Sequence, residues 1–187
     1  MAKNDLEGMR VAILCTDLFE QAEMTEPRKA LDDAGAVTVL IAPHTGKVQG
    51  VKHDRKADEF EVDVALEDAS PEDFDALLLP GGAMNADALR MEEKAQEFAR
   101  AIDRSRKPIA VICHGPWLLV SAGLTRGRTM TSYHTIQDDL KNAGAHWVDR
   151  EVVRDGNWVS SRKPDDIPAF NREMIALFGE SRGRKAA

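Results

Sequence analysis

The sequence has no hydrophobic run long enough to cross a lipid bilayer. Such a crossing needs ~20 consecutive apolar residues, and no stretch of the 187-residue chain approaches that length. The start of the chain, Met1 to Gly8, is polar and has no signal-peptide core. We therefore expect no membrane partner and a cytoplasmic location.

Cysteine is scarce, and histidine has no metal-binding spacing. Cys15 and Cys113 are the only two cysteines, which excludes a disulfide scaffold and agrees with a reducing compartment. The sequence contains five histidines, but neither an HExxH nor a CxxC motif. We predict no metal and no cofactor.

An excess of positive charge is also missing. The net charge is -7 and the isoelectric point is about 5.3. A nucleic-acid or acidic-membrane partner therefore has no general electrostatic support. Small substrates are expected instead.

The remaining composition is that of a globular protein, with 43% hydrophobic and 30% charged residues. The length suits one domain spanning 1–187. Strand-like and helix-like patterns alternate without a linker, which predicts an α/β protein, a doubly wound α/β/α sandwich with a mostly parallel, flavodoxin-like sheet. The expected strands are 9–15, 37–42, 74–79, 109–112, 129–132, 147–153 and 158–161; the expected helices are 24–34, 70–73, 92–105, 117–123, 136–143 and 165–178; an edge hairpin is expected within 45–64.

The segment around Cys113 predicts a nucleophile elbow. Ile109 to Ile112 is a short apolar run typical of a strand buried on both faces. Gly115 permits a sharp turn and Pro116 suits the first helical position, so Cys113 lies at the positive end of a helix. That position favours a thiolate and predicts a thiol pKa below its ordinary value. The alternative is a buried structural cysteine.

Polar loops follow four of the expected strands. Ligands of open α/β sheets bind at the carboxyl ends of strands, so these loops are expected to converge on one edge. The four loops are Asp17 to Gln21, Pro80 to Gly82, Cys113 to His114, and Ser132 to His134.

Glu20 is the carboxylate singled out in these loops, whereas Glu23 is placed near the solvent side of the following helix. Beside a thiolate, Glu20 would share a proton with it and have a raised pKa; alternatively, Glu20 is an ordinary solvated side chain. Gly81 and Gly82 either let backbone N–H groups approach a reacting oxygen or form only a tight turn.

Four separate motifs follow one another along the chain. They are Leu18-Phe19-Glu20-Gln21-Ala22-Glu23, Leu78-Leu79-Pro80-Gly81-Gly82, Ala110-Val111-Ile112-Cys113-His114-Gly115-Pro116 and Ser160-Ser161-Arg162-Lys163-Pro164-Asp165-Asp166-Ile167-Pro168-Ala169-Phe170. Together they resemble the ThiJ/PfpI superfamily, whose fold is similar to that of class I glutamine amidotransferases. They match its PfpI-like branch of intracellular peptidases and general stress proteins, over a core of about 9–178.

The resemblance implies roles for particular residues. It implies that Cys113 is the nucleophile, His114 its neighbouring histidine and Glu20 the proton-sharing glutamate. It also implies that the backbone N–H groups of Gly82 and His114 bind an oxyanion.

One position departs from the peptidase pattern. In PfpI-type peptidases an acid shortly after Pro-Gly-Gly reaches the neighbouring subunit and completes a triad, and only Asp87 can take that role here. The shorter aspartate puts peptidase activity in doubt. Gly81, Tyr133 and His134 are further candidates for lining the pocket, with a surface position as the alternative for His134.

The function that follows is a cysteine-dependent stress-response protein. Cys113 is expected to attack small carbonyl compounds or glycation damage of the methylglyoxal type, including damaged proteins. The alternatives are an intracellular cysteine peptidase and a non-enzymatic oxidant sensor that uses Cys113 oxidation. The resemblance also implies a homodimer or higher oligomer. Cys15 is predicted to be a buried residue that forms no disulfide with Cys113.

Overall fold

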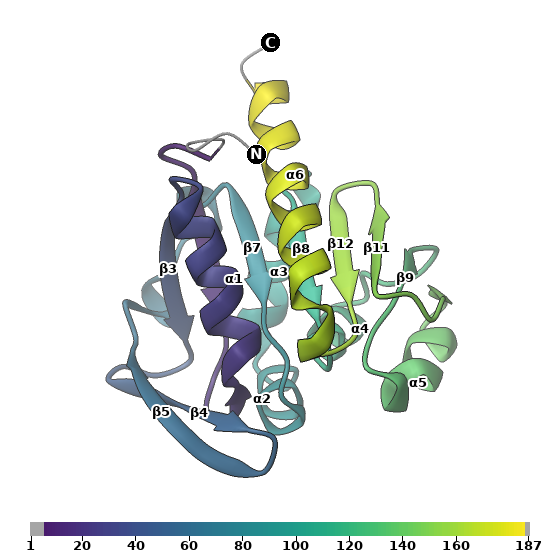
Figure 1. Cartoon of the computed structure of the whole chain (residues 1–187), viewed down its shortest axis with the longest axis horizontal. Coiled ribbons are helices and arrows are strands. Elements are labelled where there is room, and N and C mark those ends of the chain that lie inside the picture. The colour runs from purple at the N-terminus through teal and green to yellow at the C-terminus, as the bar shows by residue number, and fades with distance from the viewer. Residues whose placement is uncertain (1–5, 186–187) are drawn as a thin grey trace.

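A seven-stranded sheet forms the centre of the molecule (Figure 1). In the computed structural model, which describes residues 6–185, its strand order is β11-β12-β8-β7-β1-β3-β6. All neighbouring strands run parallel except β11, which pairs antiparallel with β12. In chain order the strands are β1 (Arg10–Leu14), β3 (Val37–Ala42), β6 (Val64–Ala65), β7 (Ala76–Leu79), β8 (Ile109–Ile112), β11 (Val152–Asp155) and β12 (Trp158–Ser161).

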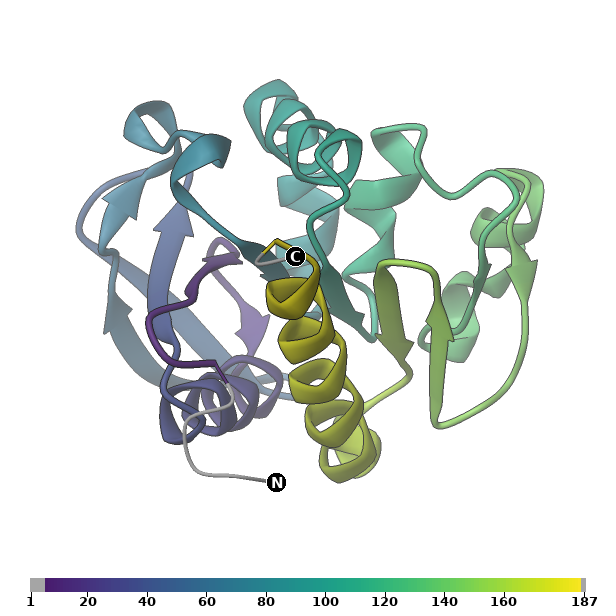
Figure 2. The same cartoon turned by 90° about the horizontal axis from the view of Figure 1, so that it is seen from above.

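Helices cover both faces of this sheet, as Figure 2 shows. In β1, Val11 and Ile13 point into a core formed with helices α1 and α6, whereas Ala12 and Leu14 point into a second core formed with α3, α4 and α5. This alternation buries the strand on both faces. The helices are α1 (Gln21–Asp33), α2 (Ala83–Leu89), α3 (Glu93–Arg104), α4 (Pro116–Ser121), α5 (Gln137–Asn142) and α6 (Ile167–Lys185). The predicted α/β/α sandwich with a mostly parallel sheet is confirmed.

The hairpin within 45–64 lies outside the central sheet. Its strands, β4 (Lys47–Lys52) and β5 (Arg55–Glu61), form a separate three-stranded sheet with β2 (Phe19–Glu20). The predicted hairpin is therefore present, but its position at the edge of the main sheet is wrong. Figure 1 shows it beside the end of the sheet where α1 begins.

Two other predicted elements differ in extent. The expected strand 147–153 is divided into β10 (His146–Trp147), which pairs with β9 (Thr129–Met130), and the edge strand β11. Residues 70–73 form only a short 3-10 turn, Pro71–Asp73, whereas helix α2 was not expected. No helix within residues 6–185 combines the length and apolar character needed to span a membrane.

Helix α1 begins at Gln21, three residues before the expected start at 24. Its first turn therefore includes Glu23, which is fully buried and not on the solvent side. This difference changes the composition of the site described next.

Candidate active site

Cys113 lies directly after β8 in a strained backbone conformation. Its φ angle is 62°, in the left-handed region that non-glycine residues rarely adopt. Two hydrogen bonds fix it: its N–H donates to the Ser161 carbonyl at 3.1 Å, and its carbonyl accepts from the Tyr133 N–H at 2.9 Å. Gly115 then lets the chain pass close to β7, because a Cβ there would lie 2.9 Å from the Leu79 carbonyl oxygen. Cys113 thus has the strained backbone of a nucleophile elbow.

The carboxyl group beside the Cys113 thiol belongs to Glu23 and not to Glu20. Glu23 enters from the first turn of α1, and its carboxyl group lies next to the Cys113 side chain against Gly81. Its Oε2 atom accepts a hydrogen bond from the Gly81 N–H at 2.9 Å. Its Oε1 atom is buried without a partner that meets strict hydrogen-bond geometry among the described residues. A proton on this oxygen would turn the buried acceptor into a donor.

Glu20 holds the hairpin instead. Its Oε2 atom accepts a hydrogen bond from the His53 N–H at 2.9 Å, at the β4–β5 turn where His53 has a φ of 60°. The side chains of Asp17 and Gln21 also hold the hairpin. They accept hydrogen bonds from the backbone N–H groups of Gln49 and Asp58, respectively. The placement of Glu20 at the thiol was wrong because the sequence analysis began α1 too late. Glu20 lines the cleft, but its carboxylate binds the β4–β5 turn, which forms another part of the cleft lining.

Burial raises the pKa values of both partners in the Glu23–Cys113 pair. The pKa of Glu23 rises from 4.5 to about 8, mainly because the carboxyl group is buried. Burial, followed by the charge of an ionised Glu23, raises the pKa of the Cys113 thiol well above its ordinary value. This direction is opposite to the predicted lowering, which neglected burial. The two groups therefore retain at least one proton between them at neutral pH.

Backbone N–H groups oppose this effect at the sulfur. The N–H groups of Gly82 and His114 both donate toward Cys113 and lower its pKa. Two backbone N–H groups directed at one point form the kind of arrangement that stabilises oxyanions in enzymes. Gly82 and His114 are the two residues whose backbone N–H groups the sequence resemblance singles out, and both lie at the thiol.

The glycine pair is crowded on all sides. A Cβ at Gly81 would overlap the Glu23 carboxyl group and would lie 2.6 Å from the Cβ of Cys113. Gly82 has a φ of 90°, and a Cβ there would lie 2.6 Å from the Glu20 backbone nitrogen. Both glycines are therefore required for close approach, and not only for a turn.

Asn85 connects two of the site loops and was missed by the sequence analysis. It is fully buried in α2. Its Oδ1 accepts the Thr16 N–H at 2.7 Å, and its Nδ2 donates to the Gly81 carbonyl at 2.9 Å. Asn85 thereby ties the loop after β1 to the Pro-Gly-Gly loop. The sequence signal was an amide residue three positions after the Gly81-Gly82 pair, but helix α2, which buries its side chain, was not predicted.

The His114 imidazole lies between the thiol and a group of aromatic rings. Its Nδ1 is 3.2 Å from the Cys113 sulfur, and its Nε2 is 3.4 Å from the Thr135 hydroxyl oxygen. The ring stacks on Tyr133 with centroids 4.9 Å apart and meets the edge of Trp117 at 5.3 Å. Burial, followed by the nearby His134, lowers the His114 pKa, which favours a neutral ring near pH 7.

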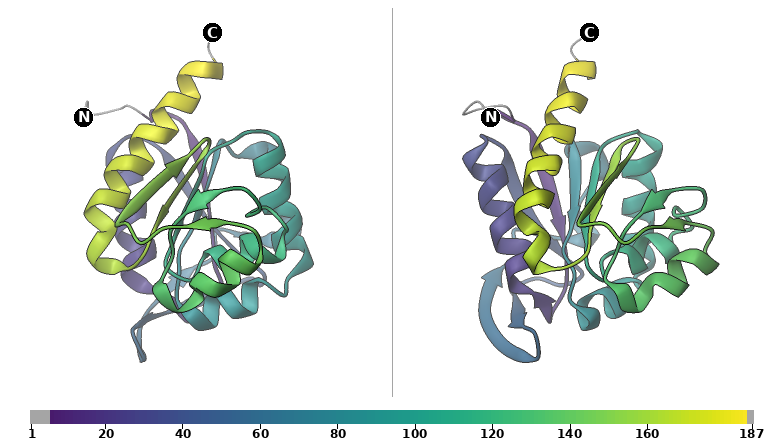
Figure 3. Two further views of the ribbon diagram at one scale, coloured as in Figure 1. Left: turned by 90° about the vertical axis from the view of Figure 1, so that its right-hand side faces the viewer. Right: turned by 45° about the vertical axis from the view of Figure 1, so that its right-hand side comes forward.

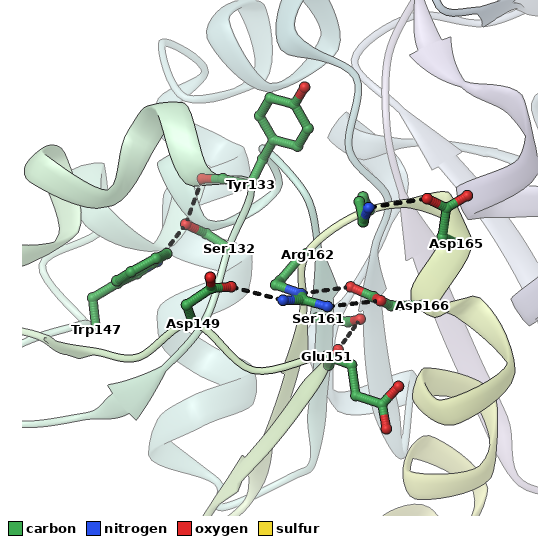
Figure 4. A network of polar contacts seen from close by, with 10 residues as sticks. Ser132, Tyr133, Trp147, Asp149, Glu151, Ser161, Arg162, Asp165 and Asp166 are labelled. Atoms are coloured by element: carbon green, nitrogen blue, oxygen red, sulfur yellow. Dashed lines mark hydrogen bonds and ion pairs between the residues drawn. The ribbon is translucent and has the colours of Figure 1, made fainter.

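The loop carrying Tyr133 is braced from behind, as Figure 4 shows. The Ser132 hydroxyl donates to the Tyr133 carbonyl at 2.9 Å and accepts from the Trp147 indole N–H at 2.9 Å. The Tyr133 ring points away from this network and lines the cleft. Gly81 lies behind the cleft wall, and His134 is exposed beside Tyr133 without lining the cleft.

A second network holds the end of β12, whose Ser161 carbonyl binds the Cys113 N–H. Arg162 donates to both carboxylate oxygens of Asp166 at 2.8 and 3.1 Å and to Asp149 at 2.7 Å (Figure 4). The Ser161 hydroxyl donates to the Glu151 carbonyl at 2.6 Å. The terminal motif of the sequence therefore stabilises the backbone that fixes Cys113.

Asp87 lies apart from these residues. It is exposed on α2 and does not line the cleft within this chain. On and just after the same helix, Met84 and Met91 are 63% and 80% exposed. The structure of one chain therefore gives Asp87 no part in the site.

An open cleft of about 430 Å³ gives access to Cys113, whose own surface is 6% exposed. Within residues 6–185, no group of three or more His, Cys, Asp or Glu side chains is arranged to hold a metal ion. The cleft lining comprises Leu18, Glu20, Glu23, Val51, His53, Asp54, Lys56, Gly82, Ala83, Met84, Cys113, His114 and Tyr133.

Comparison with known protein families identifies the family of this chain. The family model described as the DJ-1/PfpI family matches residues 9–177. The chain belongs to the DJ-1/PfpI family. In this member of the DJ-1/PfpI family, the candidate site contains Cys113 at the elbow and the buried Glu23.

Individual relatives cover most of the chain. A protein of Pyrococcus abyssi named a deglycase is 47% identical over 170 residues, 91% of this chain and 99% of its own length. General stress protein 18 of Bacillus subtilis is 44% identical over 172 residues, 91% of this chain and 98% of its own.

Among solved structures, a two-domain Anabaena variabilis protein with DJ-1/ThiJ/PfpI-like and ferritin-like domains has a TM-score of 0.86. It is 32% identical to this chain, and the match covers 91% of this chain and 48% of that one.

Proposed function

We propose that the protein is a cysteine-dependent stress-response enzyme that acts on small carbonyl compounds or on glycation damage derived from them. The observation that carries this proposal is the Cys113 thiol, which lies beside the buried Glu23 carboxyl group at the base of an open cleft. The names of relatives, a deglycase and a general stress protein, support the same class of reaction.

The first step is addition of the Cys113 sulfur to the aldehyde carbon of a 2-oxoaldehyde. In the pair that holds one proton, the ionised Glu23 carboxylate accepts the Cys113 proton as the sulfur attacks. The C–S bond forms, and the carbonyl electron pair moves to oxygen. The N–H groups of Gly82 and His114 bind this oxyanion, and Glu23 donates the proton that neutralises it.

The adduct then becomes a thioester. The hydrogen on the former aldehyde carbon leaves as a proton to the neutral His114 ring, which returns it to the adjacent ketone carbon. The hydroxyl proton on the former aldehyde oxygen passes through the Glu23 carboxylate to the former ketone oxygen, so that the first oxygen becomes the thioester carbonyl and the second a hydroxyl. Water hydrolyses the thioester, which releases a 2-hydroxy acid and regenerates Cys113. The net change is the addition of one water molecule.

Turnover of methylglyoxal tests this function. We expect wild-type protein to consume it and form lactate, the Cys15→Ala control to do the same, and Cys113→Ala to form none above the uncatalysed rate. Lactate formation at the wild-type rate by Cys113→Ala would overturn the proposal.

A cysteine peptidase is the second candidate, and the 3.2 Å contact between His114 and the Cys113 sulfur favours it. In that reaction Asp87 would orient His114 from a second subunit. The exposed Met84 and Met91 side chains on either side of Asp87 offer the apolar surface for such a homodimer.

Hydrolysis of unfolded peptides that is lost in both Cys113→Ala and Asp87→Asn, with a dimer by light scattering, would favour the peptidase. Carbonyl turnover that is unchanged in Asp87→Asn would favour the carbonyl enzyme.

A further inference from the structure

A second and larger cavity lies at the edge of the central sheet opposite Cys113. Its volume is about 650 Å³, and it is lined by the residues that precede β8 and β12 and by the side of α6 at Ser181. Cys113 follows β8, whereas Arg106 and Lys107 come before it. The two cavities are therefore at opposite ends of the same strand (Figure 3 shows the sheet from the side).

The lining of this cavity is strongly cationic in an acidic protein. Arg104, Arg106, Lys107 and Arg128 contribute positive charges, against a single carboxylate from Asp103. The whole chain carries a net charge of -7, so this local excess is opposite in sign to the rest of the molecule. Converging cations in a concave site attract anionic ligands.

Two of these cations are held in place by the protein. Arg128 donates to Asp103 at 2.9 Å and to the Asp155 carbonyl at 3.2 Å, and its guanidinium lies 4.3 Å from the centre of the Trp158 ring. Lys107 donates to the Pro71 carbonyl at 2.8 Å. The entropy cost of ordering these two side chains on a ligand is therefore already reduced.

Arg104 and Arg106 have no such partners. Both are exposed, and among the side chains that the structure describes neither forms an ion pair or a side-chain hydrogen bond. Asp103, the one carboxylate nearby, is occupied by Arg128, by Asn157 at 3.2 Å and by the Trp158 indole at 2.7 Å. Asp103 and Arg128 thus largely offset each other's charge, and Arg104 and Arg106 are available to a ligand.

We propose that this cavity binds a small molecule carrying a diphosphate group. Guanidinium groups suit phosphate oxygens because they donate paired hydrogen bonds. Two free arginines beside a fixed Arg128 match an anion with two phosphate units better than one with a single unit. The ligand is a small molecule and not a polymer, since the cations line a hollow and the surrounding protein is acidic.

Calorimetric titration of the full chain with inorganic pyrophosphate and with ADP tests the site. We expect one site, with binding weakened about tenfold in Arg104→Ala and in Arg106→Ala, the loss typical of one charge-assisted hydrogen bond. Arg150→Ala removes the same charge from an exposed arginine outside the cavity and is expected to bind as wild type. Tighter binding of ADP than of pyrophosphate would identify a nucleotide as the source of the diphosphate. Tighter binding of pyrophosphate than of ADP would identify an inorganic anion as the ligand.

Three results would overturn the proposal: no binding of either ligand, equal weakening by Arg150→Ala and Arg106→Ala, or tighter binding of a single-stranded oligonucleotide than of either diphosphate. Circular dichroism checks that the surface variants are folded. Cys113→Ala is expected to bind pyrophosphate as wild type, so the outcome is independent of the proposed carbonyl chemistry.

Discussion

The two cysteines occupy similar positions and are both buried, yet different polar groups surround their thiols. Both directly follow a parallel strand of the central sheet, and burial raises the pKa of both thiols. Cys15 is fully buried, and the negative charge of Asp17 raises its pKa further. Cys113 instead receives two backbone N–H groups and a buried carboxyl group that can take its proton. Because the position at a strand end is common to both thiols, any difference in their reactivity comes from the groups around Cys113.

The sharpest test of this contrast is alkylation. We expect iodoacetamide to modify Cys113 at least about a thousandfold faster than Cys15, because Cys15 reacts only when the core opens. Peptide mass spectrometry over time gives both rates, and Cys113→Ala serves as the control for Cys15. Comparable rates would remove the distinction.

The next test separates the two carboxylates. Glu23→Gln is expected to lower kcat/KM for the carbonyl substrate about a hundredfold, the usual scale for a lost acid–base group. Glu20→Gln keeps an oxygen acceptor for the His53 N–H. It is expected to change kcat/KM for the same substrate about threefold at most. Steady-state kinetics on both variants decides the point. A larger loss in Glu20→Gln would return the proton-sharing role to Glu20.

Glu23 also predicts a pH dependence of stability. Its pKa is raised from 4.5 to about 8 in the folded state, so the folded protein binds more protons than the unfolded chain between these values. Its contribution is complete below pH 4.5 and is lost as the pH rises through about 8. Urea unfolding should show the stability of wild type falling relative to Glu23→Gln across this interval. A constant difference between the two would contradict the raised pKa.

Oxidation by peroxide gives a smaller contrast. A protonated Glu23 can donate a hydrogen bond to an oxygen added to the Cys113 sulfur, so we expect the sulfenic acid to persist several-fold longer than in Glu23→Leu. Intact mass measured at intervals after a peroxide pulse follows the species. Equal lifetimes would mean that oxidation is ordinary damage and supports no sensing function.

The smallest expected effect concerns a link between the two thiols. Cys15 is expected to form no disulfide with Cys113 after mild peroxide, and Cys15→Ala is expected to oxidise as wild type. Non-reducing mass spectrometry would reveal a linked peptide pair and thereby contradict the assignment of Cys15 to the core.

The parts of the fold that sequence could predict are those with a strong local signal. The apolar runs at 109–112 and 37–42 give strands within a residue of their observed limits, and the Gly115-Pro116 pair marks the elbow. The assignment of Glu20 failed because proximity to the thiol depends on where α1 begins. A shift of three residues moves a side chain by nearly one helical turn.

Burial was the second quantity that local patterns did not provide. Glu23 belongs to a charged stretch, and a charged side chain is ordinarily placed on the surface. Only the packing of α1 against the Pro-Gly-Gly loop buries it. The expected direction of the Cys113 pKa failed for the same reason, since a helix end can be read from sequence whereas desolvation requires the assembled core.

Gly81 takes no part in bond making, yet its position leaves no room for a side chain. Any other amino acid would place an atom in the space that the Glu23 carboxyl group and the Cys113 side chain already occupy. A library of random variants selected for activity should therefore retain glycine there as strictly as cysteine at 113. A residue without a side chain is therefore expected to limit the sequences compatible with activity as strongly as the proposed nucleophile does.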